Sequence, residues 1–185
     1  MLRSGMTMVA VLAAAPLAAQ TATPAAPSPA APARPAHVCT GAEFHTFDFW
    51  IGRWDVYGPA GRLVAHSLIE SVYDGCGIRE NWIPLGGAGG GSLSTYVPAA
   101  KQWEQFWIDS GNTRALFTGG WNGSAMVIQG VWANAPADAT GPITRMAYSR
   151  NPDGSVRQFG ESSPDGGKTW APSFDFTYRK ARATG

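Results

Sequence analysis

Length, composition and charge place this chain among single-domain globular proteins. It has 185 residues, of which 44% are hydrophobic and 15% charged, which excludes a disordered chain and a coiled coil; its 2 cysteines exclude a disulfide-dense scaffold. The formal net charge of +1 provides no basic field for holding nucleic acid or an anionic membrane, so we expect neither partner.

Residues 1–19 predict a secretory signal peptide. Arg3 supplies the positive charge, an apolar run covers residues 8–15, and small residues ending at Ala19 suit a signal peptidase. The run is too short to span a bilayer, so we expect no integral membrane span. Because Cys39 lies far beyond the apolar run, a lipoprotein signal is not indicated. The expected location is therefore periplasmic or secreted.

Residues 20–37 predict an Ala/Pro-rich disordered linker. Between Thr21 and Ala36, twelve of sixteen residues are Ala or Pro, a composition that resists helix and sheet and favours extended polyproline conformations. A proline-rich recognition peptide is the alternative interpretation.

The folded domain is expected to span residues 38–182 and to be built almost wholly of strands. Turn signals such as Asp74-Gly75, Asn122-Gly123 and Asp153-Gly154 separate segments rich in Val, Ile, Phe, Tyr and Trp, and one helical turn is expected at Thr46 to Ile51. Short strands without helical crossovers indicate an antiparallel meander that closes into a barrel or folds into a sandwich. The candidate strands are Arg53 to Tyr57, Leu63 to Tyr73, Gly77 to Trp82, Leu93 to Val97, Gln102 to Asp109, Arg114 to Thr118, Ala125 to Trp132, Ile143 to Arg150, Val156 to Glu161 and Phe174 to Lys180.

Several strands carry aromatic and polar side chains on the same face. In Trp103 to Asp109, the tryptophans Trp103 and Trp107 alternate with Gln105 and Asp109 on one side. Such a face suits the wall of a ligand cavity, where apolar surface gives affinity and a few polar atoms fix orientation. A solvated outer face with scattered aromatics is the alternative.

Two short motifs carry a resemblance to a known superfamily. Gly52-Arg53-Trp54 opens the first strand and resembles the Gly-x-Trp signature of calycins, the superfamily of lipocalins and fatty-acid-binding proteins, and Tyr178-Arg179 lies in the last strand. The resemblance implies an all-β, lipocalin-like antiparallel barrel of about eight to ten strands. It also implies that Arg179 packs over Trp54 and closes one end, with Gly52 preceding them.

A larger set of motifs resembles a family of exported bacterial proteins of unknown function, which implies a recurring domain but no activity. The set comprises Phe47 to Val56, Gly75-Cys76, Glu80 to Trp82, Gln105 to Asp109 and Arg157-Gln158. Nitrobindin-like calycins hold haem through a histidine in their later strands, whereas His37, His45 and His66 all precede residue 67. We therefore expect no cofactor and no metal site.

Cys39 and Cys76 are expected to form a disulfide. Both meet an oxidising compartment after export, and their spacing lacks the Cys-x-x-Cys pattern of a redox-active pair, which is the alternative. Closing a loop of this size would stabilise the fold by roughly 4 kcal/mol in the chain-entropy treatment.

Two glycine-containing segments are interpreted as structural. Ser163 to Trp170 matches the Asp-box pattern of sialidase-like propellers, but a single box without repeated blades indicates a stable hairpin instead. Gly86 to Gly91 lacks the spacing of a dinucleotide-binding loop and is expected to form a loop at one barrel mouth.

We expect the barrel to hold a small hydrophobic or amphipathic molecule, because no known catalytic motif is present. One alternative is an enzyme in which Glu80 and Glu161 both point inward and perform acid–base chemistry on a bound lipid or aromatic. Another is a structural or protein-interaction module. The candidate ligand-binding residues are Trp82, Tyr96, Trp107, Tyr148 and Phe159 as apolar wall, with Glu80, Gln105, Arg145, Gln158 and Glu161 as polar anchors.

Overall fold

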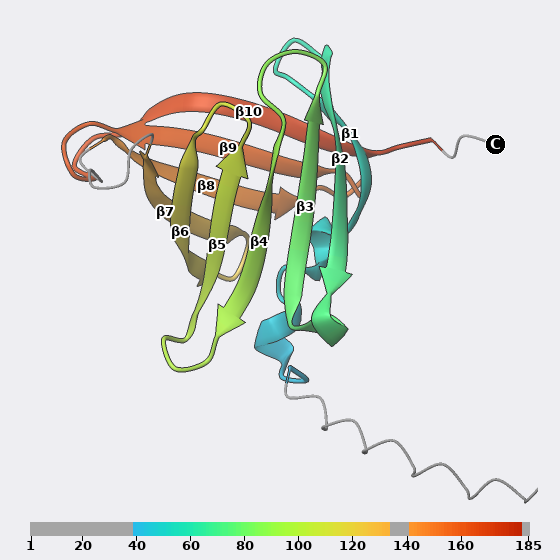
Figure 1. Ribbon diagram of the computed structural model, residues 1–185, viewed down its shortest axis with the longest axis vertical. Helices are drawn as coiled ribbons and strands as arrows, with labels where there is room; N and C mark the ends of the chain where they lie inside the picture. Colours follow the sequence, from blue (N-terminus) through green and yellow to red (C-terminus); the bar gives the residue numbers. More distant parts are fainter. Residues whose placement is uncertain (1–38, 134–140, 183–185) are drawn as a thin grey trace, which may run out of the picture. The chain divides into compact units, whose positions relative to one another are not determined.

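Antiparallel strands in chain order build the part of the chain that the computed structural model describes, residues 39–133 and 141–182. Within these residues ten strands close into a barrel, as Figure 1 shows, which confirms the predicted all-β meander. The predicted signal peptide and linker lie outside the described residues. The strands are β1 (Gly52–Tyr57), β2 (Leu63–Val72), β3 (Gly77–Pro84), β4 (Gly90–Val97), β5 (Gln102–Asp109), β6 (Arg114–Trp121), β7 (Met126–Ala133), β8 (Ile143–Arg150), β9 (Val156–Ser163) and β10 (Ala171–Lys180).

The barrel closes where the first strand meets the last. Each strand pairs with its neighbour in the sequence, and β1 pairs with β10 so that Trp54 lies opposite Lys180 and Val56 opposite Tyr178. Because successive side chains of a strand point to opposite faces, each strand sends one row of side chains inside and one outside.

The chain just before β1 fills one end of the barrel. The predicted helical turn is present as the 3-10 helix η2 (Asp48–Trp50), and a second 3-10 helix, η1 (Ala42–His45), precedes it; in Figure 1 η1 lies at the lower end of the barrel and η2 above it. Phe47 and Trp50 are fully buried, with their rings stacked at 4.9 Å, and Phe47 also meets Tyr148 at 5.0 Å. The indole N–H of Trp54 donates to the Trp50 carbonyl at 2.8 Å. This end of the interior is therefore packed with aromatic side chains.

The basic residue that covers Trp54 is Lys180, and the expectation that Arg179 does so is wrong. The Lys180 ammonium lies 3.8 Å from the centre of a Trp54 ring and donates to the Ile51 carbonyl at 3.0 Å. Arg179 stacks instead on Tyr57 at 5.0 Å. The reason is strand alternation: Tyr178 points into the core, so the residue two positions later shares its side and the intervening arginine does not.

Strand β4 begins three residues earlier than the sequence predicts, because its first residues are glycines pressed between two neighbours. A Cβ on Gly90 would lie 2.5 Å from the Ile108 carbonyl oxygen of β5, and one on Gly91 would lie 2.5 Å from the Glu80 carbonyl oxygen of β3. A side chain at either position would clash with backbone. The expected glycine loop at the mouth is correspondingly shorter.

The predicted disulfide is confirmed: Cys39 and Cys76 are bonded, with their Cα atoms 5.2 Å apart. The bond joins the segment before η1 to the turn that follows β2, where η3 (Tyr73–Gly75) ends. Among the described residues, no helix combines the length and the apolar character needed to cross a bilayer.

Lys180→Ala should lower the free energy of unfolding by about 1–2 kcal/mol, because it removes both a cation–π contact and a hydrogen bond at the closed end. The measurement is urea denaturation followed by tryptophan fluorescence. Arg179→Ala is the matched control: the Arg179 side chain lies on the outer surface, so the variant loses only an exposed contact with Tyr57 and should lower the free energy of unfolding by about 0.5 kcal/mol. Equal losses in the two variants would contradict this role of Lys180.

Candidate functional site

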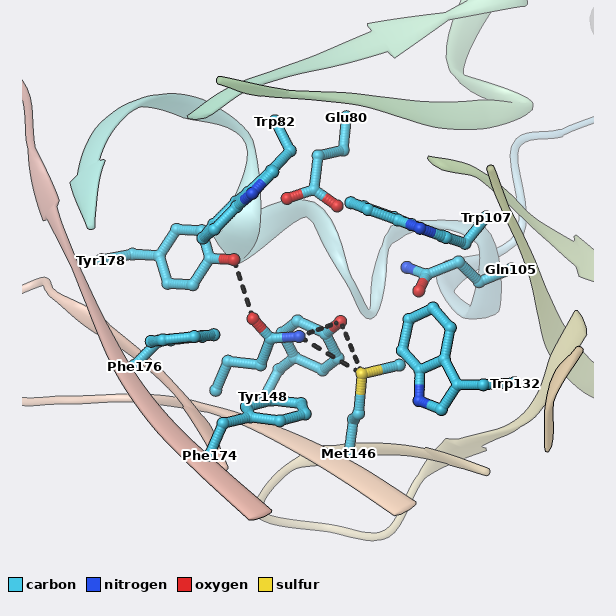
Figure 2. A pocket seen from close by; sticks show the side chains of 11 residues that line it. Glu80, Trp82, Gln105, Trp107, Trp132, Met146, Tyr148, Phe174, Phe176 and Tyr178 are labelled. Carbon is cyan, nitrogen blue, oxygen red and sulfur yellow. Dashed lines mark hydrogen bonds between the residues drawn. The ribbon is translucent and has the colours of Figure 1, made fainter. Parts of the chain in front are cut away.

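A cavity of about 190 Å³ lies inside the barrel beyond the packed end. Its walls come from six strands, β3, β5, β7, β8, β9 and β10, and Figure 2 shows their side chains converging on one space. The lining residues are Glu80, Trp82, Gln105, Trp107, Trp132, Met146, Tyr148, Gln158, Phe174, Phe176 and Tyr178.

Aromatic side chains form the more exposed part of the lining. Trp107 and Trp132 meet edge to face at 6.2 Å, and Trp82 lies 5.7 Å from Phe176, which stacks on Phe174 at 5.2 Å. All five are only partly buried, whereas the polar lining residues are buried. The cavity therefore has an aromatic mouth and a polar interior, an arrangement that gives apolar contact area together with a few orienting groups.

A chain of hydrogen bonds crosses the polar interior from β10 to β8. The Tyr178 hydroxyl donates to Gln158 Oε1 at 2.8 Å, and Gln158 Nε2 donates to the Tyr148 hydroxyl at 2.8 Å (Figure 2). The Tyr148 hydroxyl in turn points at the Met146 thioether at 3.7 Å. Because a thioether is a weak acceptor, the Tyr148 proton is available for a stronger acceptor on a bound molecule.

Among the described residues that line the cavity, Glu80 is the one carboxyl. It is 6% exposed and accepts hydrogen bonds from the Ser67 hydroxyl at 3.1 Å and the Ser92 hydroxyl at 3.2 Å. Burial raises the pKa of Glu80 from 4.5 to about 7, and the hydrogen bonds from Ser67 and Ser92 only partly oppose that rise. Near neutral pH, this side chain exists as a mixture of a proton donor and a buried anion.

Burial also changes the pKa values of the two tyrosines in the lining. Burial raises the pKa of Tyr148 and of Tyr178 well above the ordinary value, and the negative charge of Glu80 adds to both shifts. Both phenols are therefore neutral hydrogen-bonding groups at physiological pH. The described lining holds no Lys, Arg or His that could neutralise the Glu80 carboxylate.

Six residues proposed from the sequence lie together in this lining: Glu80, Trp82, Gln105, Trp107, Tyr148 and Gln158. They come from four strands: two from β3, two from β5, and one each from β8 and β9. On β3 and β5 the two residues occupy alternate positions, so the pattern of mixed aromatic and polar faces along these strands predicts their inward direction.

Three proposed residues lie on the outer wall, so their expected place in the cavity is wrong. Gln158 points inward, and alternation along β9 therefore turns Phe159 and Glu161 outward. Glu161 forms an ion pair with Arg145 at 2.8 Å, and Arg145 stacks over Trp170 at 3.9 Å. The enzyme alternative requires Glu80 and Glu161 both to point inward, and its placement of Glu161 is therefore wrong.

Tyr96 is also absent from the cavity, for a different reason. It packs at the filled end, where its ring meets Phe44 of η1 edge to face at 5.3 Å and lies 6.4 Å from Trp103. The alternation of residues along a strand predicts which side chains point inward, but it does not predict how far along the barrel axis Tyr96 lies.

Five lining residues were not expected from the sequence: Trp132, Met146, Phe174, Phe176 and Tyr178. A signal existed for the last three, because Phe174, Phe176 and Tyr178 alternate along one strand in the pattern of an inward face. For Met146, the inward position follows from that of Tyr148 two residues later.

The Asp-box segment forms the hairpin between β9 and β10. Asp165 Oδ1 accepts hydrogen bonds from the backbone N–H groups of Lys168 at 3.0 Å and Thr169 at 2.9 Å, and Oδ2 accepts one from the Thr169 hydroxyl at 2.7 Å. These bonds, led by that of the Thr169 side chain, lower the pKa of Asp165 to about 2. In the part of the chain that the structure describes, no cluster of three or more His, Cys, Asp or Glu side chains could hold a metal ion.

No model of a known protein family matches the sequence, and no curated protein matches it. The function of the cavity is therefore inferred from its geometry and chemistry.

Glu80→Gln should stabilise the protein increasingly as the pH rises from 4.5 to 7. In that window the folded wild type keeps a proton that the unfolded chain loses, so its free energy of unfolding falls as the pH rises. The full loss is about 3 kcal/mol for a pKa shift from 4.5 to about 7, and glutamine does not titrate. Urea denaturation of both proteins at a series of pH values measures the difference.

The matched control is Glu161→Gln, which removes a carboxyl from the outer wall. This variant should keep the fall in the free energy of unfolding between pH 4.5 and 7 that Glu80 causes. Parallel stability curves for wild type and Glu80→Gln across this window would contradict the assignment.

Proposed function

We propose that this protein is an exported, lipocalin-like binding protein that holds a small amphipathic molecule inside its barrel. The observation that carries the proposal is the cavity itself, in which a partly exposed aromatic mouth leads to a buried polar network. If the interior served only as a packed core, apolar side chains would fill this space, as the aromatic side chains of Phe47 and Trp50 fill the opposite end.

The size of the cavity limits the ligand. A cavity of about 150 Å³ accommodates benzene. At about 190 Å³, this one suits a single ring or a branched group of similar size with one polar substituent. A sterol or a long fatty acid would extend well beyond the aromatic mouth.

Two further features support the lipocalin-like and exported character of the proposed binder. Gly52 and Trp54 open β1, and a basic side chain from the last strand covers the Trp54 ring, although it is Lys180 and not Arg179, to which the calycin resemblance assigned that role. The disulfide between Cys39 and Cys76 is of the kind that persists in an oxidising compartment, in agreement with the signal peptide predicted at residues 1–19.

One-ring alcohols and amines, with benzyl alcohol as the first probe, should cause a saturable change in tryptophan emission. The reason is that Trp82, Trp107 and Trp132 all line the cavity. Trp132→Phe should lose part of that change, measured by fluorescence titration with excitation selective for tryptophan. Mass spectrometry of small molecules extracted from the natively exported protein would identify the occupant.

Trp121→Phe is the control for this experiment, since Trp121 is exposed and lies outside the cavity lining. It should keep the full response. No saturable response to any probe, or the same reduction in both variants, would count against binding in the cavity.

A further inference from the structure

The electrical charge of the cavity is unbalanced. The described lining contains a single acid, Glu80, and no base, and the other titratable groups that face Glu80 are the neutral phenols Tyr148 and Tyr178. Its hydrogen-bond donors, Ser67 and Ser92, are also neutral. A buried carboxylate without a cationic partner is costly, so a positive charge brought in by a ligand would gain a full ion pair there.

Besides the Glu80 carboxylate, the aromatic rings around it are a second feature that favours binding of a cation. Figure 2 shows its carboxyl between the rings of Trp82 and Trp107, with Trp132 and Phe176 facing the same space. The face of an aromatic ring attracts a cation, most strongly for tryptophan and where water is excluded. Several indoles in one small cavity with one carboxylate thus suit an ammonium group better than a neutral or negative one.

A second carboxylate, outside the lining, contacts one of the aromatic walls of the cavity. Asp109 ends β5 two residues after Trp107, and the Trp107 indole N–H donates to its carboxylate at 3.2 Å. Burial tends to raise the pKa of Asp109, but hydrogen bonds from Thr113, Trp107 and Gly111 outweigh it and lower the pKa. This carboxylate remains ionised, favouring the approach of a cation and opposing that of an anion.

We propose that the molecule held in the barrel is a small organic cation of the alkyl- or arylammonium class, with the Glu80 carboxylate as its anchor and Trp82, Trp107 and Trp132 as its aromatic walls. This inference rests on the proposed binding function and specifies its ligand. A neutral ligand would leave the carboxylate unpaired, and a fatty acid would place a second negative charge beside it. The available volume fits a trimethylammonium head with a short substituent.

The test compares each cation with an uncharged molecule of the same shape by isothermal titration calorimetry. The pairs are choline with its analogue in which carbon replaces nitrogen, and phenyltrimethylammonium with tert-butylbenzene. Above pH 8 each cation should bind at least about tenfold more tightly than its partner. Below the pKa of Glu80 the affinity for the cation should fall about tenfold per pH unit, since the carboxyl must lose its proton to pair with it.

Glu80→Gln should abolish the preference for the cation and its pH dependence while retaining tert-butylbenzene binding, which shows that the cavity is intact. Glu161→Gln, which removes a carboxyl from the outer wall, should behave as wild type. If the uncharged partners bind equally well or better, or if Glu80→Gln keeps the preference, the cation inference is overturned while binding in the cavity stands. If neither member of either pair binds, and the benzyl alcohol titration also gives no response, both proposals fail.

Discussion

The pairing of β1 with β10 is the constraint on which the rest of the structure depends. Once the sheet is closed, each side chain points either into the interior or to the outer surface, and residues two positions apart on a strand point to the same side. Glu80 lies between Ile78 and Trp82 on β3, and all three face inward. The acid therefore cannot turn to solvent unless its two apolar neighbours leave the interior with it.

The segment before β1 determines how the interior is divided. Phe47 and Trp50 occupy one end and pack against Tyr148, so that this tyrosine has its ring in the packed core and its hydroxyl in the cavity network. The core thus positions the polar groups of the site as well as stabilising the barrel. The disulfide at Cys39 attaches the same segment to the turn between β2 and β3, which limits how far these packed aromatic side chains can move.

The strands and their closure follow from local patterns, but the inward face of each strand does not. On β9 the row with Phe159 and Glu161 looks richer in ligand-binding groups than the row with Gln158 and Gly160, yet the second row faces inward. Gly160 matters because its missing side chain makes room for the Phe174 ring of β10, a contact between strands that no single-strand pattern contains. The outward row is instead used for surface pairs, such as Glu161 with Arg145. The wrong expectation for Arg179 has the same cause, because the pairing of β10 with β1 places Lys180, and not Arg179, over Trp54.

Glu80 is difficult to explain as a contribution to the fold. Its hydrogen bonds to Ser67 and Ser92 satisfy its oxygens, but a neutral amide of the same shape could accept one and donate to the other without the cost of a buried charge. Nor does it pair with a base, as Glu161 does on the outer wall. The Glu80 carboxylate lowers the stability of the protein above neutral pH. Its presence in a cavity with aromatic walls is explained if its negative charge binds a ligand that enters the cavity. The energetic cost in the empty barrel then becomes part of the affinity for a cation.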